Sequence, residues 1–129
     1  MTIAELCLPL MVILAIVSIG PAKLDGIKEF DNGYPRDPGF YRPGLRARAL
    51  GAQQNGFEAF PFFAAAVIVA EMRGAAQGWV NALAVAFLAM RVVYVLMYID
   101  DRPSLRSTVW GLAFACNLAL FFAPIWAGR

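Results

Sequence analysis

Four apolar stretches, each close to the length that crosses a bilayer, take up most of this 129-residue chain. They cover about residues 3–22, 45–72, 78–99 and 104–127. A hydrocarbon core about 30 Å thick is crossed by about 20 apolar residues, and only a helix satisfies its own backbone there. We therefore predict an all-α membrane protein, a single domain over residues 1–129 whose four transmembrane helices form an up-down-up-down bundle.

The composition supports a lipid environment and excludes several kinds of partner and chemistry. Hydrophobic residues make up 60% of the chain and charged residues 16%, whereas about a quarter of a soluble domain is charged. A net charge of +2 is too small to predict a nucleic-acid partner. The chain has no histidine, so we expect neither a metal site nor a histidine-based hydrolase. Cys7 and Cys116 each lie in an apolar stretch, as buried hydrophobic residues do.

The basic residues predict how the chain is oriented. Residues 23–44 form a long polar loop rich in proline and glycine. Eight basic residues lie in or beside the first and third loops: Lys23, Lys28, Arg36, Arg42, Arg46, Arg48, Arg102 and Arg106. The other side has two, Arg73 and Arg129. By the positive-inside rule, loops one and three of this multi-pass protein are cytoplasmic and both termini lie on the opposite side.

Two charged residues stand inside predicted spans. Glu58 lies well within residues 45–72, and Arg91 interrupts residues 78–99. A charged side chain in a span costs about 2.5–3.5 kcal/mol, so each needs a partner or a function. Both lie toward the cytoplasmic ends of their helices, and we expect the two to pair.

Two polar stripes accompany these charges. Helical spacing places Arg48, Gly51, Asn55 and Glu58 on one face, and Arg91, Tyr94 and Tyr98 on another. Together they predict a pocket that opens toward the cytoplasm, with Arg102 and Arg106 at its rim. Arginine, amide and hydroxyl donors suit a carboxylate, and Glu58 suits an ammonium. A polar network that only holds the helices together, with the tyrosines at the membrane interface, stays an alternative.

The motifs resemble those of a known family. Residues 48–62 are similar to the second helix of the MAPEG family, the membrane-associated proteins in eicosanoid and glutathione metabolism. The family pattern R-x-x-x-A-x-x-N-x-x-E, often followed by proline, is matched by Arg48, Ala52, Asn55, Glu58 and Pro61. Gln53 and the spacing of Pro61 resemble the leukotriene-C synthase branch. The likeness continues in the Arg91, Tyr94 and Tyr98 stripe and in Arg106-Ser107, so it covers essentially the whole chain.

The resemblance implies a homotrimer of microsomal glutathione transferase type, with glutathione bound between neighbouring subunits near the cytoplasmic face. The cosubstrate would contact Gln53, Asn55, Glu58, Tyr94 and Tyr98, with Arg48 and Arg91 as further candidates from the stripes. Arg106 would lie beside the thiol and favour the thiolate, which is the nucleophile. The implied activity is a glutathione transferase or peroxidase acting on small lipophilic electrophiles that partition into membrane lipid.

Several positions depart from the family pattern. Members that use glutathione usually have arginine at the position of Gly51 and often tyrosine at that of Ala59, and a further arginine after the first helix is represented here only by Lys23 or Lys28. These departures remove anion contacts. Two alternatives therefore stay open: a non-catalytic lipid-binding or scaffold member of the family, and a relative that uses another small thiol or anion.

Overall fold

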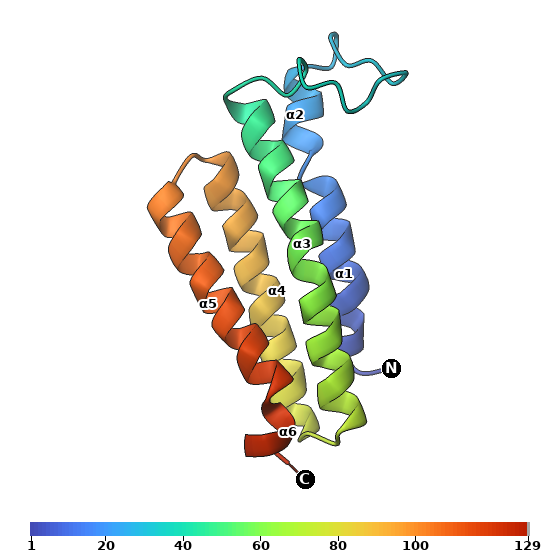
Figure 1. Cartoon of the computed structure of the whole chain (residues 1–129), viewed down its shortest axis with the longest axis vertical. Helices are drawn as coiled ribbons and strands as arrows, with labels where there is room; N and C mark the ends of the chain where they lie inside the picture. The colour runs from blue at the N-terminus through green and yellow to red at the C-terminus, as the bar shows by residue number, and fades with distance from the viewer. Residues whose placement is uncertain (129) are drawn as a thin grey trace.

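The computed structural model describes residues 1–128 and consists of helices joined by turns and one long loop. The helices are α1 (Ile3–Val17), α2 (Gly20–Asp25), α3 (Leu45–Met72), α4 (Gln77–Ile99), α5 (Pro103–Phe121) and α6 (Ala123–Trp126). The four long helices run side by side (Figure 1). Both termini lie at one end, and the 26–44 loop and the α4–α5 turn lie toward the other. Arg129, assigned above to the side of the termini, lies outside the described residues.

Three stretches of residues 1–128 are helical, long and apolar enough to cross a membrane: Ile3–Asp25, Leu45–Met72 and Gln77–Ile99. The fourth expected span corresponds to α5, which does not qualify because its first turns carry the polar residues Ser104, Arg106, Ser107 and Thr108. It also ends at Phe121, six residues earlier than expected, and α6 follows as a single turn.

The first expected helix is divided in two. A capping box starts α1, in which Thr2 accepts from the Glu5 amide and the Glu5 carboxylate accepts from the Thr2 amide. The helix stops at Val17, where the Ser18 hydroxyl donates to the Ala15 carbonyl at 2.8 Å. Pro21 then stands in the first turn of α2, a position where its missing N–H costs nothing. The polar loop therefore begins after Asp25 and not at residue 23.

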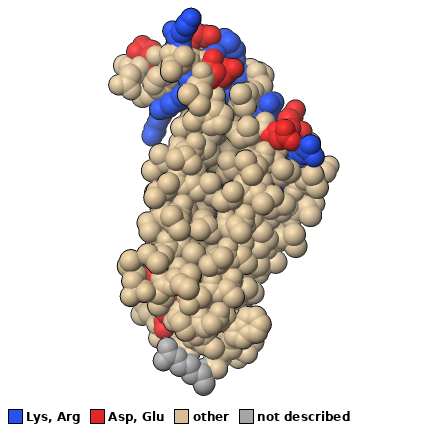
Figure 2. Space-filling model, turned by 180° about the vertical axis from the view of Figure 1, so that it is seen from behind, with Lys and Arg blue, Asp and Glu red and all other residues tan. Residues whose placement is uncertain are grey.

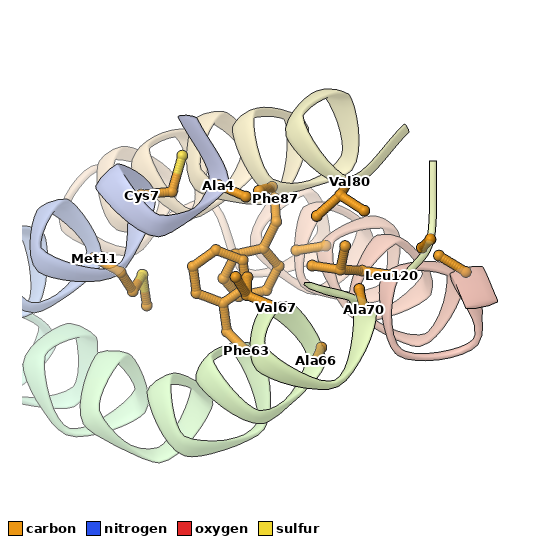
Figure 3. Packing of buried hydrophobic residues seen from close by; sticks show 14 residues of the cluster. Ala4, Cys7, Met11, Phe63, Ala66, Val67, Ala70, Val80, Phe87 and Leu120 are labelled. Atoms are coloured by element: carbon orange, nitrogen blue, oxygen red, sulfur yellow. The ribbon is translucent and has the colours of Figure 1, made fainter. Parts of the chain in front are cut away.

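A tightly packed apolar core lies in the half of the molecule that holds the termini. Residues of four helices meet there: Ala4, Cys7, Met11, Phe63, Ala66, Val67, Ala70, Val80, Phe87 and Leu120 (Figure 3). The rings of Phe63 and Phe87 stack at 4.2 Å between centroids. Small residues let the helices approach closely, and a Cβ at Gly56 would lie only 2.8 Å from the Cβ of Ala15. The rest of the helix surface is largely apolar, as expected for residues facing lipid.

A polar network closes the terminal end of the bundle. Glu71 at the end of α3 accepts hydrogen bonds from the Thr2 hydroxyl at 2.8 Å and from the Gln77 amide at 2.9 Å. Gln77 also donates to Asn81, which accepts from the backbone of Ala4. The network therefore joins the starts of α1 and α4 to the end of α3 and fixes their register.

Most charged residues gather at the other end, over α2 and the loop (Figure 2). The centre of this group is Arg46, whose side chain is 3% exposed. It donates to Asp25 at 2.7 Å and to both carboxylate oxygens of Glu29 at 2.8 and 3.1 Å. Its guanidinium lies 4.7 Å from the ring centroid of Phe40, and Arg42 pairs with Glu29 at 3.1 Å. This loop cluster (Asp25, Glu29, Phe40, Arg42 and Arg46) anchors the 26–44 loop to the start of α3.

Candidate functional site

A groove runs between α3 and α5, with α4 as its floor. On α5, Arg106, Trp110, Ala113 and Asn117 follow one another at helical spacing. Six of the eight residues predicted to form the site lie on this side of the bundle. Asn55, Glu58 and Arg91 line a hollow there, and Tyr94, Tyr98 and Arg106 continue from Arg91 through ring and guanidinium contacts. The other two, Arg48 and Gln53, are engaged elsewhere.

Tyr98 organises the end of the groove near the α4–α5 turn. Its ring lies 4.4 Å from the guanidinium carbon of Arg106 and packs edge to face on Tyr94 at 5.6 Å between centroids. The Tyr98 hydroxyl fills the space beside Gly51, where an added Cβ would overlap it. Gly51 is therefore a point of close approach, and an arginine at that position would displace Tyr98.

Arg48 is directed to the end of α4. Its Nε donates to the Ile99 carbonyl at 3.1 Å, and its Nη1 lies 3.8 Å from the Asp101 carboxylate. The last carbonyls of a helix have no partner within it and attract cations. Arg48 therefore fixes the turn from which α5 starts, and it does not point its donors into the groove.

Arg91 and Glu58 do not form the expected ion pair. Within residues 1–128, Asn55 lies between them: Arg91 Nη2 donates to Asn55 Oδ1 at 2.8 Å, and Asn55 Nδ2 lies 3.4 Å from Glu58 Oε2. Arg91 is 1% exposed and its guanidinium lies 4.2 Å from the Tyr94 ring centroid. The prediction was wrong because Asn55, one turn nearer the loop end, reaches Arg91 first, while Glu58 stays exposed.

A cavity of about 190 Å³ lies below this chain of contacts, between α3, α4 and α5. It is lined by Asn55, Glu58, Ala59, Phe62, Phe87, Arg91, Trp110, Ala113, Phe114 and Asn117. Ala59 is one of the lining residues, and its side chain is small. The sequence analysis missed Asn117, although a single amide within the apolar run of α5 was a usable signal. We refer to this space as the inner cavity.

Gln53 lies on another face of α3. Two residues away from Asn55 along a helix, it points roughly to the opposite side. It lines a second hollow of about 580 Å³ beneath the loop, together with Arg36, Tyr41, Leu50, Gln54, Phe57 and Glu58. Glu58 borders both hollows, so it stands on the ridge between them.

Comparison with known proteins gives one match. A family model described as the MAPEG family matches residues 3–126, nearly the whole chain. Neither the curated proteins nor the solved structures gave a match.

Proposed function

Because the chain belongs to the MAPEG family, we propose that it is a membrane glutathione transferase or peroxidase that acts on small lipophilic electrophiles. Within the family we place it with the members similar to microsomal glutathione transferases and leukotriene-C synthase, on account of Gln53 and Pro61. The glutathione thiol would lie at the loop end of the groove, and the electrophile would reach it from the lipid.

The position of Arg106 carries this proposal. It lies in the first turns of α5, half-buried, with its guanidinium held over the Tyr98 ring. Among residues 1–128 no carboxylate lies within ion-pair distance of it. A fixed cation without a protein counterion, at the positive end of a helix, favours a thiolate over a thiol. Such a site activates a thiol without histidine.

We propose further that α5 is the fourth span, that loops one and three face the cytoplasm, and that the protein is a homotrimer. Gln53 on α3 lines the hollow beneath the loop, whereas Tyr98 on α4 lies against the Gly51 face of α3. A ligand that contacts both residues would therefore take them from two neighbouring copies. Cross-linking in mild detergent is expected to stop at three subunits, and a monomer with intact helicity would contradict the trimer.

One observation favours the second candidate, a non-catalytic lipid-binding protein. The space beside Gly51 is closed by Tyr98, so the arginine that glutathione-using relatives carry there has no substitute at that point. Calorimetry of the purified protein with glutathione separates the two functions. Binding at or below millimolar concentration supports the enzyme, and an absence of binding at millimolar glutathione leaves the lipid-binding function.

A further inference from the structure

The inner cavity is large enough for a small molecule. Its volume is about 190 Å³, and an engineered apolar cavity of about 150 Å³ is known to bind benzene. Phe62, Phe87, Ala113 and Phe114 supply apolar walls. A body about one aromatic ring in size therefore fits.

Two buried polar side chains also line this cavity. Arg91 is 1% exposed and Asn117 is 2% exposed, and both line the cavity. Within residues 1–128, Arg91 Nε and Asn117 Oδ1 have no hydrogen-bond partner. Buried polar groups in folded proteins are almost always paired, so two unpaired atoms around one cavity indicate a missing partner. One atom is a donor and the other an acceptor.

We propose that the inner cavity binds a small apolar molecule through a hydroxyl group. Such a group accepts from the Arg91 guanidinium and donates to the Asn117 amide oxygen, which turns toward it about the broad terminal torsion of the side chain. The charged lining residues are Glu58 and Arg91, whose charges cancel. A neutral ligand therefore fits better than a carboxylate or an amine.

The ligand would enter from the lipid. Trp110 and Phe114, which both line the cavity, stack at 5.4 Å between centroids and are 44% and 41% exposed. They form an apolar edge between the surface and the cavity. This inference rests on the cavity alone and requires no thiol, so calorimetry with glutathione tests the proposed function separately.

Equilibrium dialysis with three ligands of similar size tests the inference. Isopropylbenzene offers no hydrogen bond, acetophenone only accepts, and 2-phenyl-2-propanol both accepts and donates. The opposite chamber holds the same concentration of detergent micelles without protein, so that ligand dissolved in the detergent is equal on both sides and only ligand bound to the protein is measured. We expect the alcohol to bind about tenfold more tightly than isopropylbenzene, with acetophenone between them. Equal binding of all three, as expected if a water molecule satisfies both atoms, would overturn the proposal.

The Asn117→Leu variant removes the acceptor with little change in volume. The alcohol should then lose its advantage over acetophenone, while isopropylbenzene still binds. Cys116→Ala, a change at the next residue of α5 that does not line the cavity, should keep the wild-type order. An alcohol advantage that survives in Asn117→Leu would exclude Asn117 as the partner. If that variant does not fold, the three-ligand order of the wild type still decides.

Discussion

The two most deeply buried arginines of the chain have opposite surroundings. Arg46 is 3% exposed and Arg91 is 1% exposed. Arg46 donates to Asp25 and to both oxygens of Glu29, so its charge is matched by carboxylates. Each of its three side-chain nitrogens has a partner within the chain, which is what a structural anchor requires.

Arg91 has partners of a different kind. It donates to the neutral amide of Asn55 and lies over the Tyr94 ring, and its Nε finds no partner in the described part of the chain. A buried charge without a carboxylate is costly and usually accompanies a function. The loop cluster thus holds the fold together, whereas in the groove a donor of Arg91 stays available to a ligand.

The largest effect is expected at Arg106, at the loop end of the groove. If Arg106 stabilises the glutathione thiolate, Arg106→Ala should lower turnover at neutral pH about 100-fold, as loss of one preorganised charge-stabilising group does. The pKa of the bound thiol should rise, which ultraviolet absorbance of the thiolate measures across a pH titration. Arg73→Ala, at an exposed arginine just after α3 at the end of the bundle that holds the termini, is the control and should leave the titration unchanged. An unchanged curve in Arg106→Ala would remove Arg106 from the mechanism.

Gly51 offers a test of how tightly the groove is packed. Gly51→Ala should lower the free energy of unfolding by about 1–3 kcal/mol, because its Cβ would overlap the Tyr98 hydroxyl. Adding Tyr98→Phe should recover part of the loss. Gly111→Ala on α5, where no atom of residues 1–128 lies within 4 Å of the added Cβ, should be neutral or stabilising by less than about 1 kcal/mol. Denaturant unfolding in detergent measures all three, and equal effects at both glycines would contradict the close approach.

Acid should release the loop cluster. The hydrogen bond from Arg46, aided by Arg42, lowers the pKa of Glu29 from 4.5 to about 2. Because the folded value is the lower one, the stabilisation is fully present above pH 4.5 and is lost as the pH falls toward about 2. Carboxyl carbon NMR should find the Glu29 midpoint near the lower value. Glu29→Gln should loosen the 26–44 loop already at neutral pH, seen as faster hydrogen exchange, and a midpoint near the ordinary value would show that the cluster does not form.

The smallest effect is expected at Arg91 itself. Arg91→Met should change the free energy of unfolding by less than about 1 kcal/mol, because loss of an uncompensated buried charge offsets loss of the Tyr94 and Asn55 contacts. Thermal unfolding of Arg91→Met and of Arg46→Met tests the difference between the two arginines, because only Arg46→Met leaves carboxylates without their partner. A large loss of stability in Arg91→Met alone would show that Arg91 holds the fold together in the same way as Arg46.

Some of the fold follows from the sequence. The expected spans 45–72 and 78–99 differ from α3 and α4 by at most one residue at each end, because turn residues and charges flank clean apolar runs. The break after Val17 does not follow from the apolar run, because Pro21 is compatible both with a continuous membrane helix and with the first turn of a new one, where the structure places it.

The site was predictable only where it depends on one helix at a time. Helical spacing alone places Asn55 and Glu58 on one face and Arg91 and Tyr94 on another. It does not give the rotation and depth of one helix against the next, which decide that Asn55 and not Glu58 meets Arg91. Asn117 was missed for the same reason, since its place depends on how α5 packs against α3 and α4.

The exposed stack of Trp110 and Phe114 has a consequence for how the site samples its surroundings. A molecule that enters past this apolar edge arrives by diffusion in the plane of the bilayer. The ligand concentration at the entrance is then set by its solubility in the lipid and not by its concentration in water. A compound that binds weakly would still occupy the cavity if it accumulates in the membrane. Which compounds occupy the cavity therefore depends first on their partitioning into lipid and then on their affinity for the protein.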